Sequence, residues 1–217
     1  MIQFELARIK KVLCLGAHSD DIEIGCGGAI LKILKECPDV EIYWIVFGAT
    51  GEQRIKEAKA SAETFLKGVK RKKIVIKSFR DGYFPYVGGE IKEVFEEIKK
   101  EFVPDLVFTH YGNDGHQDHR TLSQLAWNTW RNHFILEYEI PKYDGDLGRA
   151  NAFIPVSRAI AERKVKYLMK YFATQRNKHW FTADLFYSLM RLRGMESNAA
   201  STYAEGFYCR KVVLGAA

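Results

Sequence analysis

The sequence predicts a single α/β domain in which helices cover both faces of a mostly parallel sheet. Three observations predict it: 47% of the 217 residues are hydrophobic, short apolar runs alternate with amphipathic stretches, and polar loops follow the apolar runs. A chain of this length can bury a substantial core, yet it is short for two domains of ordinary size. We therefore expect residues 1–217 to form one domain.

Four short runs of branched and aromatic residues indicate buried strands. They are K-K-V-L-C-L-G-A (10–17), V-E-I-Y-W-I-V-F (40–47), K-I-V-I-K (73–77) and D-L-V-F-T-H (105–110). Between them, apolar residues recur three or four positions apart, as in helices that pack on a sheet. The helical positions are Ile30, Ile33, Leu34 and Cys37, then Ile55, Ala58, Ala62, Phe65 and Leu66, then Ile91, Val94, Phe95, Ile98 and Phe102. This alternation predicts a Rossmann-like core with right-handed crossovers in residues 1–138.

The pattern is less regular in residues 139–217. We expect helices near 159–173 and 182–193, and a final strand in G-F-Y-C-R-K-V-V-L (206–214). This part is expected to complete a substrate pocket. Tyr143, Asp144 and Trp180 could line that pocket, or their side chains could serve the core or a subunit contact.

The chain carries a formal net charge of +6, concentrated in K-G-V-K-R-K-K (67–73) and in residues 158–193. Such runs are most often solvated faces, and attraction of an anionic substrate is the alternative. The basic residues come with no nucleic-acid motif, so we expect no nucleic-acid partner. No apolar stretch approaches the length that spans a bilayer, and no leader pattern is present. We therefore expect a cytoplasmic protein without a transmembrane segment.

The four cysteines are scattered and form no C-x-x-C pair. Cys14 lies within an apolar run, where packing is the usual role of a cysteine. This spacing argues against a disulfide framework and against a zinc-thiolate site.

Three polar loops follow predicted strands. They are G-A-H-S-D-D-I-E-I-G-C-G-G (16–28), G-A-T-G-E-Q-R (48–54) and H-Y-G-N-D-G-H-Q-D-H-R (110–120). The carboxyl ends of parallel strands lie at one edge of a sheet, and ligands bind there. We therefore expect these loops to meet and to form the functional site.

Histidine and aspartate are paired in two of these loops. His18 and Asp21 are three positions apart, as are His116 and His119, and this spacing places two side chains on one side of a helical turn. Two histidines and a carboxylate are suitable ligands for a catalytic zinc that keeps a position open for water. The sequence thus predicts a metal site between the two loops.

Spacing alone leaves the individual roles open. One of Asp20 and Asp21 could bind the metal while the other acts as a general base. In the same way, one of His116 and His119 could be a ligand while the other, oriented by Asp118, acts as an acid or stabilises an oxyanion.

Each of these residues also has an ordinary structural interpretation. A single loop histidine is usually a surface hydrogen-bonding group, and an aspartate before a helix is commonly an N-cap. The glycines of G-C-G-G (25–28) lack the G-x-G-x-x-G spacing of a dinucleotide site, so close helix packing is the better explanation for them. The metal-site prediction rests on both clusters falling at strand ends with complementary ligand types.

The two loops together resemble the paired signature of the PIG-L/LmbE family of zinc-dependent N-acetylglucosaminyl deacetylases. The resemblance is carried by A-H-S-D-D-I-E-I-G-C-G-G and D-G-H-Q-D-H-R. Further matching features are T-G-E (50–52) with Arg54 and Glu57, P-D-L-V-F-T-H (104–110) and Y-A-E-G-F (203–207). Ser19 stands where the family usually has proline, a change that affects the stiffness of the loop and leaves the ligand types unaltered.

The resemblance implies a role for each matching residue. It places the metal ligands at His18, Asp21 and His119 and the general base at Asp20. Zn²⁺ is the implied ion, and Fe²⁺ or Co²⁺ would suit the same ligands.

The resemblance also implies assisting residues. It places the histidine that assists the tetrahedral intermediate or the leaving amine at His116, paired with Asp118. Arg54 corresponds best to an arginine that contacts substrate in the family.

The implied activity is hydrolysis of the N-acetyl group of an N-acetylglucosamine-type amino sugar. The sugar would be carried on a glycoside, a nucleotide-sugar or a lipid-linked carrier, and the basic segments allow an anionic one. One alternative is an amidase or deacetylase for a non-sugar acylated metabolite, and another is a catalytically silent glycan-binding protein. The family resemblance also leaves a homo-oligomer open.

Overall fold

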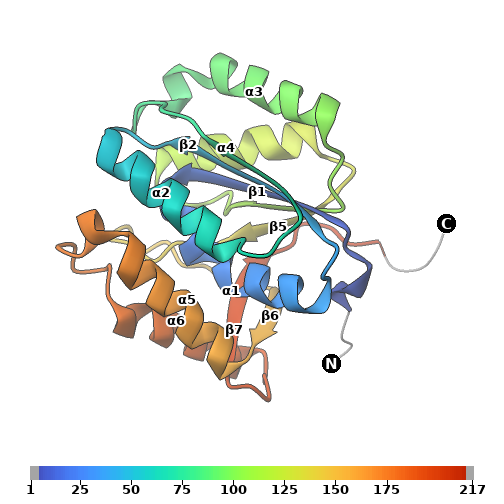
Figure 1. Cartoon of the computed structure of the whole chain (residues 1–217), viewed down its shortest axis with the longest axis vertical. Coiled ribbons are helices and arrows are strands. Elements are labelled where there is room, and N and C mark those ends of the chain that lie inside the picture. Colours follow the sequence, from blue (N-terminus) through green and yellow to red (C-terminus); the bar gives the residue numbers. More distant parts are fainter. Residues whose placement is uncertain (1–4, 214–217) are drawn as a thin grey trace.

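The computed structural model describes residues 5–213 as one seven-stranded sheet between two layers of helices (Figure 1). The strands are β1 (Lys11–His18), β2 (Glu41–Gly48), β3 (Arg71–Ile76), β4 (Leu106–His110), β5 (Phe134–Tyr138), β6 (Ala152–Val156) and β7 (Tyr203–Tyr208). The helices are α1 (Asp21–Glu36), α2 (Glu52–Phe65), α3 (Gly88–Glu101), α4 (Gln117–Thr129), α5 (Arg158–Tyr171) and α6 (Ala183–Glu196). The short 3₁₀ helix η1 (Leu6–Arg8) precedes β1, and two others, η2 (Phe84–Tyr86) and η3 (Ala173–Gln175), lie in connections between longer elements. The predicted α/β class is confirmed.

The strand order is β3-β2-β1-β4-β5-β7-β6. Strands β1 to β5 are parallel, whereas β7 runs antiparallel to both β5 and β6. The chain winds outward from β1 in one direction to β3 and then returns to β4 on the other side. Sheets of this kind bind ligands where the order reverses, at the carboxyl ends of the two central strands. Here that position lies between β1 and β4.

Each face of the sheet has its own apolar core. Along β1, Val12 and Cys14 pack toward α1, α2, α5 and α6, whereas Leu13 and Leu15 pack toward α3 and α4. Successive side chains of a strand point to opposite faces, so a strand buried on both faces is apolar throughout. The continuous apolar runs of the sequence arise from this arrangement, and the two helix layers are visible in Figure 1.

The structure differs from the sequence-based expectation mainly in its last third. The final strand is Tyr203–Tyr208 and not 206–214: Val212 and Val213 are exposed, and residue 214 lies outside the described residues. The prediction followed branched residues that have no neighbouring strand to pair with. Strand β6 was not predicted, because Pro155 within it lacks a backbone donor; such strands occur at sheet edges, and β6 is an edge strand.

Two buried ion pairs attach the C-terminal elements to the core. Lys164 Nζ lies 2.6 Å from Glu205 Oε1, and Glu205 also accepts the backbone N–H groups of Gly28 (2.8 Å) and Ala29 (2.6 Å). Arg193 binds both carboxylate oxygens of Glu139, at 2.7 and 2.6 Å. A Cβ atom at position 28 would come within 2.8 Å of the Glu205 carboxylate, so this glycine allows the close approach. Among the described residues, no helix combines the length and apolar character needed to cross a bilayer.

Gly25 allows helix α1 to lie directly on Tyr138. A Cβ atom at this position would overlap the Tyr138 ring, whose hydroxyl donates to Leu15 O (2.7 Å) and lies 3.1 Å from His110 Nε2. We expect Gly25→Ala to lower the free energy of unfolding by about 1–3 kcal/mol, because overpacking forces the ring to move. Urea unfolding measures this change.

Gly89→Ala, on α3, is the matched control for that substitution. Nothing lies within 4 Å of a Cβ atom at position 89, so the added methyl group should be neutral or slightly stabilising. Equal unfolding free energies for the two variants would contradict the close packing of α1 on Tyr138.

Candidate metal centre

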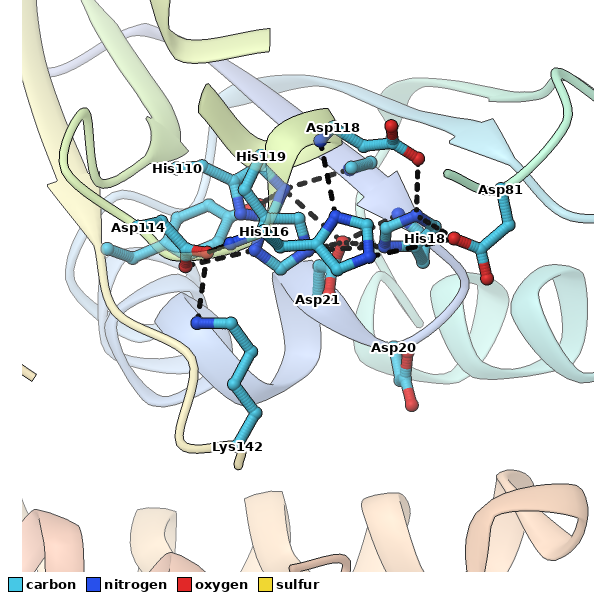
Figure 2. A network of polar contacts seen from close by, with 12 residues as sticks. His18, Asp20, Asp21, Asp81, His110, Asp114, His116, Asp118, His119 and Lys142 are labelled. Carbon is cyan, nitrogen blue, oxygen red and sulfur yellow. Dashed lines mark hydrogen bonds and ion pairs between the residues drawn. The ribbon is translucent and has the colours of Figure 1, made fainter. Parts of the chain in front are cut away.

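The two polar clusters meet at the carboxyl ends of β1 and β4, as Figure 2 shows. His18 is the last residue of β1, Asp20 is the N-cap of α1, and Asp21 is the first residue of that helix. His116 is the N-cap of α4, and His119 lies in its first turn. The sequence-predicted loops therefore come together where the strand order reverses.

Three predicted ligand atoms converge at this edge. His18 Nδ1 lies 3.2 Å from His119 Nε2 and 3.4 Å from Asp21 Oδ2, and the last two atoms are 3.5 Å apart. Two imidazole nitrogens and a carboxylate oxygen at such distances are a suitable donor set for a divalent transition metal.

Other combinations of ligands are also close together. His18, His116 and His119 form one group, and Asp21, His110 and His119 form another; within each group all ligand atoms lie within 4.8 Å of one another. The geometry therefore brings every predicted metal ligand together and adds His110 to the neighbourhood.

In both His18 and His119, the ring nitrogen that does not face the converging ligand atoms contacts a carboxylate; we call it the outer nitrogen. His18 Nε2 lies 3.2 Å from Asp118 Oδ2 and 3.1 Å from Asp81 Oδ1. His119 Nδ1 lies 3.0 Å from Asp114 Oδ2. A metal-binding histidine usually donates its second ring N–H to such a partner, which fixes its tautomer and its orientation.

Asp118 is arranged differently from the expectation that its carboxylate orients His116. Its Oδ2 atom accepts the N–H of Gly82 (2.6 Å) and contacts His18, and its Oδ1 atom accepts the N–H of Phe84 (3.1 Å). Only its backbone N–H reaches His116, at 3.2 Å from Nδ1. From the first turn of α4 the Asp118 side chain points toward the end of β1, so its carboxylate lies beside Nε2 of His18.

The protonation of the two converging histidines follows from their surroundings. Burial lowers the pKa of His119 to about 3, and the neighbouring His110 adds to the shift, so that the ring of His119 is neutral. Burial alone would lower the pKa of His18, but its hydrogen bonds to Asp118, Asp21 and Asp81 raise it well above the usual value. A metal binding at His18 would therefore displace a proton.

Asp20, the N-cap of α1, forms an ion pair with Arg54 of α2. Arg54 Nη2 lies 3.2 Å from Asp20 Oδ1, while the buried Asp20 Oδ2 has no hydrogen-bond partner among the described residues. Burial raises the pKa of Asp20, although the Arg54 guanidinium opposes the shift. Arg54 also donates to the Thr174 hydroxyl (3.4 Å), whose backbone N–H donates to Glu57 (3.0 Å). Helix η3, from the C-terminal part of the chain, is thereby fixed beside the site.

His116, the half-buried N-cap of α4, carries a ring N–H next to the cluster. Its Nδ1 atom accepts the Asp118 N–H, so the neutral ring carries its proton on Nε2. Burial and the neighbouring His18 lower the pKa of His116, which keeps the ring neutral. His116 Nε2 lies 3.7 Å from Asp81 Oδ1, the same carboxylate oxygen that contacts Nε2 of His18.

Sequence reasoning did not assign His110, Asp81 or Asp114 to the site. The His110 ring stacks on His119 with centroids 3.9 Å apart, and its Nε2 accepts the Ala17 N–H at 2.9 Å. Each of the three had a usable signal: His110 ends a predicted strand, and both aspartates lie in polar loops beyond strand ends. Among the residues expected to line a pocket, Tyr143 is exposed and Trp180 packs edge-on against Phe181.

Glu23, in the first turn of α1, is a buried carboxyl group near the site. It is 1% exposed, and neither carboxyl oxygen has a hydrogen-bond partner among the described residues. Burial raises its pKa from 4.5 to about 8. Because the folded protein then holds a proton that the unfolded chain releases, stability decreases as the pH rises from about 4.5 to about 8.

Glu23→Gln keeps the shape of this side chain and removes its titration. We expect the variant to exceed the wild type in free energy of unfolding by on the order of a few kcal/mol at about pH 9, and to match it below about pH 4.5. Urea unfolding of the metal-free protein measures the difference, with Glu63→Gln, an exposed residue of α2, as the control. A difference that does not change with pH would show that Glu23 does not titrate in this range.

The fold and the histidine–aspartate cluster define an α/β protein with a candidate metal site at the switch point of its sheet. The profile of the family described as "PIG-L: GlcNAc-PI de-N-acetylase" matches residues 13–130, which is more than half of the chain. The chain belongs to the PIG-L family.

Similar proteins are found among curated sequences and solved structures. The chain is 35% identical to the diacetylchitobiose deacetylase of Thermococcus kodakarensis over 129 residues, which cover 52% of this chain and 46% of that protein. The structure of N,N'-diacetylchitobiose deacetylase from Pyrococcus horikoshii superposes with a TM-score of 0.67 and 24% identity, covering 93% of this chain and 84% of that one. A 4-carboxy-2-hydroxymuconate hydratase from Pseudomonas putida KT2440 superposes with a TM-score of 0.68 and 18% identity, covering 96% and 100%. This fold therefore occurs with more than one kind of chemistry.

Proposed function

We propose that this chain is a metal-dependent deacetylase that removes the N-acetyl group from an N-acetylglucosamine-type amino sugar. The observation that carries the proposal is the convergence of His18 Nδ1, Asp21 Oδ2 and His119 Nε2, with the unpartnered carboxylate oxygen of Asp20 on the residue next to Asp21. Metal ligands next to a free, buried carboxylate are what hydrolysis of an amide requires.

His18, Asp21 and His119 would hold the ion, with Zn²⁺ as the expected metal and Fe²⁺ or Co²⁺ as alternatives. The donor set fits such an ion, because His119 is neutral and both histidines place their outer nitrogens on carboxylates. A bound divalent ion supplies Lewis-acid polarisation of the amide oxygen and lowers the pKa of water.

Asp20 is the proposed general base. Arg54 holds its Oδ1 atom, which leaves Oδ2 free to take a proton from the attacking water. A carboxyl group whose pKa is raised by burial can later give that proton to the departing amine. Acetate and a free amino sugar are then the products.

His116 is proposed to stabilise the developing oxyanion through its Nε2–H group. A neutral histidine at the start of a helix is suited to donating a hydrogen bond there and is a weak proton donor. Asp118 is proposed to act on His18, where its carboxylate lies, and not on His116.

An amino-sugar substrate is supported by the family description and by the names of the relatives that act on diacetylchitobiose. We propose that residues 139–217 complete the pocket, because Thr174 of η3 accepts a hydrogen bond from Arg54, which contacts Asp20. Arg54 and Lys178 both place positive charge near Asp20, which suits a glycoside, nucleotide-sugar or lipid-linked carrier with an anionic group.

Acetate release from a panel of acetylated compounds tests the proposal. The panel contains N,N'-diacetylchitobiose, N-acetylglucosamine, its simple glycosides, a nucleotide-sugar and an acetylated amine without a sugar. Zinc-loaded protein should release acetate from at least one of the amino sugars. Release from the non-sugar amine alone would replace the sugar assignment, and metal binding without any release would favour a glycan-binding protein.

A further inference from the structure

Lys142 lies in the loop that follows β5, close to the candidate metal centre (Figure 2). Its side chain is 9% exposed, and its Nζ atom lies 2.9 Å from Asp114 Oδ1 and 3.6 Å from Asp144 Oδ2. It also pairs with Asp146. The three aspartates could by themselves suggest a second cation site, but the Lys142 ammonium already supplies the positive charge among them.

Asp114 connects this ammonium to the metal centre. Its Oδ2 atom lies 3.0 Å from His119 Nδ1, and its Oδ1 atom accepts the His116 N–H at 2.8 Å. Lys142 Nζ and His119 Nδ1 thus contact different oxygens of the buried Asp114 carboxylate. Rotation of that carboxylate would break the contact with His119.

We propose that Lys142 is a positioning residue for His119: it fixes the Asp114 carboxylate so that His119 keeps its proton on Nδ1 and directs Nε2 to the metal. The inference rests on the proposed metal site and extends it to a residue from the C-terminal part of the chain. Lys142 contacts neither the converging ligand atoms nor Asp20, so its action is through Asp114.

The loop that carries Lys142 is closely packed on the segment before α4. Asp146 accepts the Gly115 N–H, and a Cβ atom at position 115 would lie 2.7 Å from Asp144 Cβ. Gly115 therefore permits direct contact between the two loops. This contact holds Lys142 in place beside Asp114.

The charge of Lys142 could act in the opposite direction, because a cation near the site repels a metal ion. Three carboxylates surround this single ammonium, so the cluster as a whole is negative and the repulsion is largely cancelled. We therefore expect the loss of position to exceed the relief of repulsion, and metal affinity to fall when the charge is removed.

Binding of Co²⁺ alone tests this inference, using Lys142→Met and the wild type. Loss of an outer-shell partner of a metal ligand weakens metal binding by about 10–100-fold, and we expect about tenfold here because Lys142 acts through Asp114. The visible spectrum of bound Co²⁺ should also change, since it reports the orientation of the ligands. Lys142→Arg should restore both readouts, because it keeps the charge.

Lys72→Met is the matched control. Lys72 lies on β3, the edge strand at the opposite end of the sheet from β6, and its Nζ atom pairs with Glu63 of α2 at 2.9 Å. If Lys142→Met is poorly folded, the double variant Lys142→Met with Asp146→Asn removes one charge of each sign and keeps an acceptor for Gly115, and the same result is expected. Unchanged or tighter Co²⁺ binding with an unchanged spectrum would overturn the role of Lys142 alone. Absence of Co²⁺ binding by the wild type would overturn the metal site as well.

Discussion

Asp20→Asn should abolish most acetate release while the protein keeps its metal. The asparagine amide cannot take a proton from water, although its oxygen can still accept from Arg54, which now contacts Oδ1 at 3.2 Å. Loss of a positioned general base typically lowers kcat by about 10²–10⁴-fold. We expect a decrease in this range, with little change in metal content or in the unfolding free energy. Steady-state acetate release and metal analysis of the purified variant measure these quantities.

Asp39→Asn is the control for that variant, because Asp39 is an exposed aspartate that pairs at 3.9 Å with an exposed lysine. It should retain wild-type activity. An Asp20→Asn variant with near-normal kcat would show that another group takes the proton.

His119→Ala should lose the metal together with the activity. The substitution removes one of three proposed ligands, and the loss of affinity should exceed the roughly 100-fold upper range seen for outer-shell changes. Calorimetric titration with Zn²⁺ measures the affinity, and acetate release should fall in parallel. This variant therefore differs from Asp20→Asn, which keeps the metal and loses only the chemistry.

The exposed residue His179 provides a matched control. His179→Ala should bind Zn²⁺ as the wild type does. If His119→Ala also bound Zn²⁺ with unchanged affinity, the ion would be held by other residues. One such group consists of His18, Asp81, His116 and Asp118.

Most of the core fold could be predicted from the sequence, because parallel strands that are buried on both faces are continuous apolar runs. Strand β1, with Val12 and Leu13 packed on opposite faces, is an example. Strands β5 and β6 were missed for physical reasons: buried Glu137 interrupts the apolar run of β5, and Pro155 interrupts β6. The sequence pattern does not show that Glu137 is paired with Arg210, or that the strand containing Pro155 lies at the edge of the sheet.

The candidate site could be predicted where its residues are close in sequence. His18 and Asp21 share one loop and His119 lies in another, and both loops end predicted strands. Contacts between segments that are distant in sequence could not be predicted. Examples are the contact of the Asp118 carboxylate with His18 and that of Lys142 with Asp114, 28 positions away. Such pairs depend on which loops the sheet brings together, and that depends on the strand order.

Titration of metal-stripped protein with Zn²⁺, with acetate release from the amino-sugar panel followed at each step, tests the central claim most directly. We expect the rate of release to rise in proportion to bound Zn²⁺ and to level off at about one ion per chain. Equal acetate release by the metal-free protein, or full Zn²⁺ binding with no release from any amino sugar, would contradict the assignment of this site to metal-dependent deacetylation.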